Sequence, residues 1–192
     1  MAKAYAWLMR CSEWAEREAE RLLEPLGRRW LHSRAVAERA ESVSGVVEPD
    51  ERDLLVAAAY LHDVGYAPAL SCSGFHPVDG GNWVAGQGFD RLASLVAYHS
   101  GSKHEASLRG LTAELAAFVE ERTIVAAALA YCDLTVGPGG EAMTPEQRLA
   151  DVEERHGIDG PVAAGLRLAW PELLGAVALI EERLRVGSDQ PM

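Results

Sequence analysis

The chain has 192 residues, a formal net charge of −11 and an apolar fraction of 48%. That apolar fraction supports a packed core and argues against a disordered chain. The negative charge repels nucleic-acid phosphates, and no basic stripe opposes it, so the sequence argues against a nucleic-acid-binding module.

Cysteine usage and apolar runs bear on the cellular compartment. The three cysteines are far apart and form no C-x-x-C pair, which argues against a disulfide framework or a thiolate zinc site. Charges return early, at Arg10 and Glu13, so no signal-peptide core is expected, and the uninterrupted apolar runs are too short to span a bilayer. We therefore expect a cytoplasmic protein with no membrane partner.

The periodic segments predict helices, because valine and isoleucine seldom alternate with polar residues as they do in strands. In chain order, helices are expected over about residues 3–23, 28–43, 51–63, from 76 onward, 90–99, 121–134, 145–156 and 162–186. Thr144 and Pro145 are typical of an N-cap and a first helical turn, and Pro171 should kink or split the last helix. We expect a single all-α domain over residues 1–192, with a motif-bearing core over about residues 28–140.

The stretch VAAAYLHDVGYAP carries a helix without a polar face into His62 and Asp63. An aspartate in the last turn of a helix opposes the negative end of the helix dipole, and burying it ionised and unpaired is costly. A bound cation would remove both objections. The plainer alternative is a histidine that caps the helix beside a carboxylate that faces solvent.

Other ligand-type side chains lie at the edges of apolar helices. His32 falls on the apolar stripe of its helix, and Asp133 ends the apolar run TIVAAALAYCD. His99 ends another apolar stripe, whereas His76 begins a predicted helix, where an N-cap role is the alternative. Imidazole nitrogens and carboxylate oxygens together suit Fe, Mn, Co, Ni or Zn as divalent ions.

The order His32, His62-Asp63, Asp133 resembles the signature of the HD-domain metal-dependent phosphohydrolase superfamily. The words WLHSRAVAERA, AAYLHDVGY and ALAYCDLTVGPGG carry this resemblance, and TPEQRLADVEERHG extends it toward residue 157. The resemblance implies an all-α, HD-domain-like helical bundle with the metal site between helices. It also implies that His32, His62, Asp63 and Asp133 are metal ligands.

Two further histidines resemble the extra ligands of dinuclear branches of this superfamily. They are His76 in FHPVDGG and His99 in AYHSG. One such branch contains hydrolases of symmetrical dinucleoside polyphosphates. With both histidines as ligands, Asp63 would bridge two metal ions. The alternative is a single ion, with His76 and His99 contacting substrate phosphate or holding waters.

The resemblance implies a metal-dependent phosphohydrolase, and we expect it to act on a nucleotide or another small phosphoester with a metal-activated water as the nucleophile. Asp63 and Lys103 are the predicted catalytic residues, Lys103 as a charge that faces the phosphate. A solvated loop lysine is the alternative for Lys103. Arg34, Arg109 and Arg148 are further candidates for substrate contacts, with structural salt bridges as the alternative for Arg34 and Arg148.

The sequence leaves other functions open. A non-catalytic metal- or nucleotide-binding regulator could keep all the ligands, and a hydrolase of another substrate or an iron oxygenase could use the same cage. The chain lacks a P-loop, G-x-S-x-G and H-E-x-x-H, so we expect no organic cofactor. Glu153 and His156 form a single E-x-x-H, and we interpret both as solvated helix residues. The oligomeric state is open, with a homo-oligomer as one option.

Overall fold

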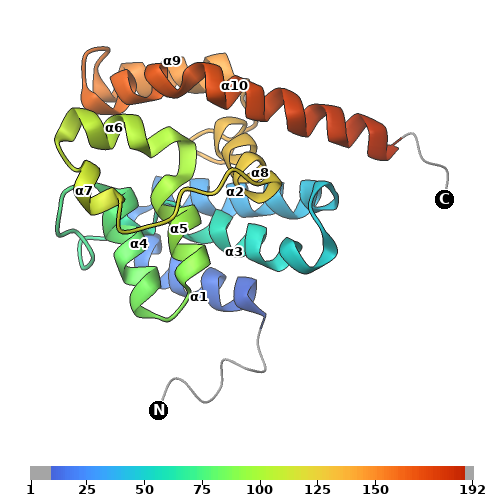
Figure 1. The fold of residues 1–192 in the computed structure, drawn as a ribbon, viewed down its shortest axis with the longest axis horizontal. Coiled ribbons are helices and arrows are strands. Elements are labelled where there is room, and N and C mark those ends of the chain that lie inside the picture. Colours follow the sequence, from blue (N-terminus) through green and yellow to red (C-terminus); the bar gives the residue numbers. More distant parts are fainter. Residues whose placement is uncertain (1–9, 189–192) are drawn as a thin grey trace.

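The computed structural model describes residues 10–188 and is built from helices (Figure 1). The α-helices are α1 (Cys11–Leu23), α2 (Arg28–Val43), α3 (Arg52–Leu61), α4 (His76–Gly86), α5 (Asp90–Tyr98), α6 (Ser102–Arg109), α7 (Thr112–Leu115), α8 (Ile124–Leu134), α9 (Pro145–His156) and α10 (Pro161–Ser188). Within the described residues there is no β-strand, and extended pairing is limited to an isolated bridge between Val136 and Ala142. The prediction of an all-α fold is confirmed.

Most predicted helices match the observed ones to within a few residues. The first was predicted to begin at Lys3, and its residues before Arg10 lie outside the described part of the chain. Pro171 lies inside α10 without splitting it. A proline removes one helical hydrogen bond, and burial of Ala169 and Leu173 on either side of it offsets that loss.

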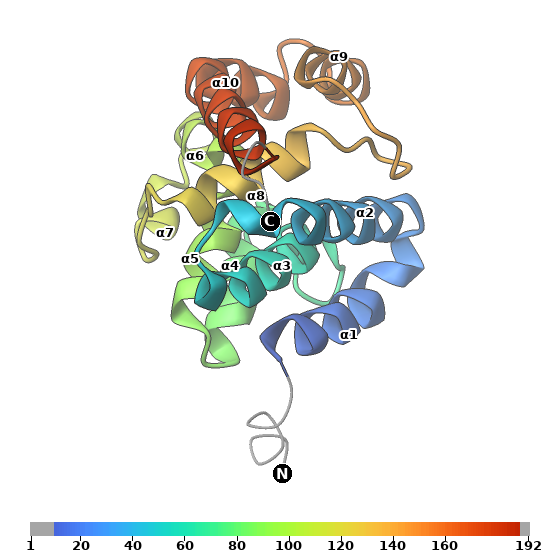
Figure 2. The same ribbon diagram turned by 90° about the vertical axis from the view of Figure 1, so that its right-hand side faces the viewer.

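The core is formed around α3 and α8, which lie in the middle of the molecule in both views (Figures 1 and 2). Both helices are buried along most of their length, and both contact α2. Ala57, Ala58 and Ala59 of α3 are fully buried, and such small side chains let neighbouring helices approach closely. Helix α1 covers one side of this centre, and α9 with α10 covers the other (Figure 2).

Two glycines allow close approaches that shape the middle of the molecule. A Cβ atom at Gly65 would lie 2.0 Å from the carbonyl oxygen of His76, so the turn after α3 can pack against the start of α4 only because this residue lacks a side chain. Gly101 has φ +73°, and a Cβ there would lie 2.3 Å from Cβ of Ala169 in α10. The ends of α3 and α5 are thereby held against α4 and α10.

Residues Pro161–Gly187 of α10 form a helix that is long and apolar enough to cross a membrane, by length and composition only. Its apolar sequence is interrupted by Arg167 and Glu172, so it contains no long uninterrupted apolar run. The core helix of a water-soluble protein passes the same test. In the structure α10 packs against α6, α8 and α9. The absence of a membrane partner stays a prediction.

Candidate metal centre

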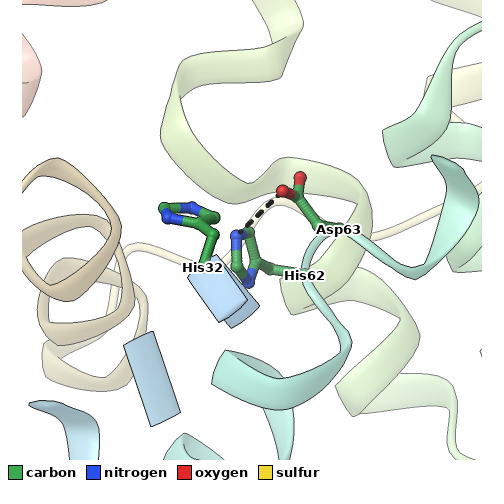
Figure 3. A group of neighbouring side chains, drawn as sticks. All are labelled: His32, His62 and Asp63. Atoms are coloured by element: carbon green, nitrogen blue, oxygen red, sulfur yellow. Dashed lines mark ion pairs between the residues drawn. The ribbon is translucent and has the colours of Figure 1, made fainter. Parts of the chain in front are cut away.

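Three of the predicted ligands meet where α2 faces the end of α3. His32 comes from α2, His62 is the residue that follows α3, and Asp63 begins the next turn. Their side chains are almost completely buried, and their potential ligand atoms all lie within 4.8 Å of one another. Figure 3 shows the two rings side by side, with the Asp63 carboxylate 3.5 Å from Nε2 of His62.

Asp133 joins this group from the last turn of α8. Its Oδ1 atom lies 2.9 Å from Nε2 of His32 and 3.8 Å from Nε2 of His62. The side chain is buried, as expected for a carboxylate that ends an apolar helix. The structure therefore brings together all four residues of the predicted primary set, from three separate helices.

Backbone carbonyls fix the orientation of three histidine rings. Nδ1 of His32 lies 3.1 Å from the carbonyl oxygen of Gly137, Nδ1 of His62 lies 2.7 Å from that of Ala59, and Nδ1 of His99 lies 2.6 Å from that of Val96. A carbonyl only accepts hydrogen bonds, so each Nδ1 carries the donated hydrogen. In the neutral ring the Nε2 lone pair then points away from the carbonyl, in the manner of a metal-binding histidine.

The Nε2 atom of His62 shows whether a metal ion fits here. It is buried and has no hydrogen-bond partner among the described residues. Leaving a buried polar atom unpaired is unfavourable, and native proteins rarely do so without a ligand or an ion. With two carboxylates and His32 around it, this nitrogen lies in a donor set that suits a divalent transition metal.

A second group of three ligand atoms adjoins the first. Nε2 of His76 lies 3.4 Å from Oδ1 of Asp63 and 3.3 Å from Nε2 of His99, and the ligand atoms of these three residues also lie within 4.8 Å of one another. Oδ2 of Asp63 faces His62 while Oδ1 faces His76. Asp63 therefore lies between the two groups, in the position predicted for a bridging carboxylate.

The charges around the cluster hold the two carboxylates ionised. Burial alone favours the neutral acids, but the nearby Arg29 guanidinium outweighs it at Asp63 and holds the pKa of that carboxyl well below the ordinary value. His32 and Arg148 do the same at Asp133, whose pKa is also well below its ordinary value. Burial lowers the pKa of His76 and that of His99, so these rings are held neutral.

Sequence analysis missed Arg29 and Ser100. Nη1 of Arg29 donates to Oδ2 of Asp63 at 2.6 Å, and its guanidinium lies over the Tyr66 ring, 3.8 Å from the centroid. The Ser100 hydroxyl donates to Oδ2 of Asp133. Ser100 also has φ +49°, a left-handed conformation that is unfavourable for a residue with a side chain and that tends to occur at functional sites.

Arg148 is the one arginine candidate from the sequence that reaches the cluster. One of its Nη atoms lies 3.2 Å from Oδ1 of Asp133, and the other lies 3.2 Å from Asp151. Arg34 instead pairs with Glu38 on the surface of α2, and Arg109 pairs with Glu105. The expectation of a structural salt bridge thus suits Arg34.

Lys103 has acidic partners that the sequence does not indicate. Its ammonium group lies 2.8 Å from Glu120 and 2.8 Å from Glu172. It lines a cavity of about 300 Å³ between α5, α8 and α10, and His99 and Ser100 also line this cavity. The role of Lys103 as a charge that faces the phosphate stays a prediction.

His156 was expected to be solvated, but it helps to line the cavity in front of the cluster. This cavity, of about 80 Å³, is bordered by the cluster residues Asp63, His76, His99 and Asp133, and also by Arg29, Arg148, Arg155 and His156. The reason is tertiary, because residues of α9 and Arg29 of α2 line the same cavity, which the local sequence does not reveal. Glu153 is partly buried and pairs with Arg167 of α10.

The comparison with protein families gives one result. The model of the HD domain family matches residues 29–155, a span that begins at Arg29, ends at Arg155 and contains all six predicted ligands. No curated protein and no solved structure matches the chain.

Proposed function

This chain belongs to the HD domain family, and we propose that it is a metal-dependent phosphohydrolase that acts on a nucleotide or another small phosphoester. The observation that carries the proposal is a largely buried set of four histidines and two aspartates beside a cavity that basic side chains also line. Acidic ligands for a cation and basic partners for an anion are thus combined in one place. This combination is what phosphoryl transfer to water requires.

The donor groups divide naturally into two ligand sets. His32, His62, Asp63 and Asp133 would hold a first divalent ion, and Asp63, His76 and His99 would hold a second. Such ions would polarise a phosphoryl oxygen and provide a nucleophilic water near neutral pH. Fe, Mn, Co, Ni and Zn all suit these nitrogen and oxygen donors.

The chain's own residues supply orientation and charge. Backbone carbonyls hold the histidine rings, and the Ser100 hydroxyl holds one oxygen of Asp133. The Tyr66 ring stacks on His76 with ring centroids 3.9 Å apart. The Arg29 guanidinium lies over the same Tyr66 ring. Arg29 and Arg148 are placed to contact phosphate oxygens and to stabilise the charge that develops as the ester bond breaks.

Local charge explains how an acidic protein would attract an anion. The formal net charge of −11 opposes phosphate binding at long range. At the cavity, however, three arginines and the bound cations would reverse the sign. Small phosphorylated molecules are therefore the proposed partners, and a cytoplasmic location stays a prediction.

Metal analysis combined with a substrate screen tests the proposal. The purified protein should contain a transition metal, and it should release phosphate or a nucleoside monophosphate from some nucleotide or phosphoester with multiple turnovers. Chelation should stop the release, and added manganese or cobalt should restore it. Asp63→Asn should lose both the metal and the turnover, whereas Asp50→Asn, at an exposed position, should keep both.

Other results would favour other functions. Stoichiometric nucleotide binding without turnover under several metals would support the non-catalytic regulator. Redox-active iron without release of phosphate would support an oxygenase built on the same ligands. Full metal occupancy in Asp63→Asn would contradict the assignment of the ligands themselves.

A further inference from the structure

A second cavity, of about 350 Å³, adjoins the one in front of the cluster. Its lining includes four arginines, Arg28, Arg29, Arg148 and Arg155, together with His32 and Tyr66. Within the described part of the chain, no aspartate or glutamate lines it. Such a concentration of positive charge is notable in a chain whose formal net charge is −11.

The four arginines come from two helices that border the same cavity. Arg28 and Arg29 open α2, and Arg148 and Arg155 lie on one face of α9, two turns apart. Asp151 lies between the last two and accepts hydrogen bonds from both, at 3.2 Å from Arg148 and at 2.6 Å from Arg155. It directs both guanidinium groups but carries only one negative charge for two positive ones.

Arg28 differs from the other three arginines. It is exposed, and no hydrogen bond or ion pair joins it to another residue between positions 10 and 188. Arg29 is paired with Asp63, and Arg148 is paired with Asp133 as well as with Asp151. Cations bound at Asp63 and Asp133 would neutralise those carboxylates in place of Arg29 and Arg148. Most of the positive charge of the arginines would then be uncompensated.

We propose that this four-arginine cavity is a subsite for a second anionic group of the substrate, separate from the phosphoryl group that reacts at the cluster. The two cavities share Arg29, Tyr66, Arg148 and Arg155 in their linings, so one molecule can reach both. Guanidinium groups bind phosphate oxygens in pairs, and several converging arginines select a polyanion over a single phosphate.

The consequence is a substrate class. The preferred substrate carries a chain of at least two phosphates, or two phosphates on one small molecule, rather than one phosphoester on a neutral body. The identification of the bound polyanion as a substrate rests on the proposed hydrolysis. The binding of a polyanion in the cavity does not depend on that hydrolysis. Binding and turnover can therefore be measured separately.

The test compares tripolyphosphate with orthophosphate by titration calorimetry, on the full chain as isolated and again after dialysis against chelator. Tripolyphosphate should bind at least about tenfold more tightly than orthophosphate to the protein as isolated, because it reaches several arginines at once. After chelation the preference should be smaller, since Arg29 and Arg148 are then paired with Asp63 and Asp133. The affinities of adenosine triphosphate and adenosine monophosphate are compared in the same way. This comparison shows whether the bound phosphates can belong to a nucleotide as well as to an inorganic chain.

Variants locate the binding. Arg28→Ala combined with Arg155→Ala should remove most of the preference for tripolyphosphate, a loss of about tenfold or more. The matched control, Arg34→Ala with Arg122→Ala, removes the same charge from exposed positions outside the cavity and should keep the preference. Arg28→Glu alone, at an exposed position without partners, should lower tripolyphosphate affinity and leave the fold intact.

Equal affinities for the two anions would overturn the proposal, and so would equal losses in the cavity variant and in the control. The two proposals fail in different ways. Tight tripolyphosphate binding through the arginines, without release of phosphate from any ester, would remove the proposed hydrolysis and keep the subsite. Turnover of monophosphoesters with equal binding of both anions would remove the subsite and keep the hydrolysis.

Discussion

The Nε2 atoms of His76 and His99 face each other at 3.3 Å. Because Nδ1 of His99 donates to the carbonyl of Val96, Nε2 of that neutral ring has a lone pair and no hydrogen. The two nitrogens can approach in this way if His76 supplies the hydrogen or if a cation lies between them and Asp63. The second arrangement is the dinuclear site that the sequence predicts.

His99→Ala tests whether a second ion is present. The variant should lower the metal stoichiometry from two toward one and leave the first ion largely in place, because the other ligand set keeps all its members. The turnover rate should be largely lost, whereas the free energy of unfolding should fall only slightly. The variant removes one buried hydrogen bond to the carbonyl of Val96, worth about 1 kcal/mol, in addition to the ligand.

Metal analysis and thermal unfolding of the same preparations make this measurement. His104→Ala is the control, because His104 lies outside the clusters of potential ligands found in the described residues. A stoichiometry of one in both wild type and His99→Ala would favour the mononuclear alternative, in which His76 and His99 contact substrate or water.

Ser100 combines an unfavourable backbone conformation with a contact to Asp133, and two substitutions separate these effects. Ser100→Ala and Ser100→Gly both remove the hydroxyl that holds Asp133, so both should weaken metal binding, by about 10- to 100-fold for a supporting residue of this kind. Only glycine adopts φ +49° without cost, so Ser100→Gly should be more stable than Ser100→Ala by about 1 kcal/mol.

Competition with a chelating dye gives the metal affinity, and urea unfolding in the presence of chelator gives the stability. Wild-type affinity in Ser100→Ala would show that the hydroxyl does not orient Asp133. Equal stability of the two variants would show that the left-handed backbone at position 100 is not strained.

The particular residues show how far the sequence predicts the site. His62, Asp63 and Asp133 are candidates from the sequence because polar side chains that end apolar helices need a reason to be buried. The resemblance to the HD-domain superfamily implies that His32 completes the ligand set. Thr144 was recognisable as an N-cap because its capping box with Gln147 is local. These features depend on neighbours within a few turns of the chain.

Lys103 and Arg155 show why the rest could not be predicted. Lys103 lies four residues from His99, but its direction is set by Glu172, which is distant in the sequence. Arg155 reaches the cavity because the tertiary structure brings residues of α9 and of the start of α2 to one cavity. Charges on helix surfaces carry no periodic signal of their partners, so their roles appear only once the helices are placed.

Gly65→Ala tests the backbone contact that joins the two ligand groups. A Cβ at this position would lie 2.0 Å from the carbonyl oxygen of His76 and 2.6 Å from the backbone nitrogen of Gly80, and backbone atoms cannot yield as the end of a flexible side chain can. The start of α4 must therefore move, and His76 moves with it. We expect a loss of about 2–4 kcal/mol in unfolding free energy and a loss of the second metal ion.

The matched control is Gly86→Ala at the other end of α4, where nothing lies within 4 Å of the added carbon. That substitution should keep the metal content and leave stability unchanged or raise it by up to about 1 kcal/mol, since alanine favours the helix. Urea unfolding and metal analysis of both variants make the comparison. If Gly65→Ala unfolds like Gly86→Ala and retains both ions, the packing of the turn after α3 against α4 does not position His76, and the coupling between the two ligand groups must come from Asp63 alone.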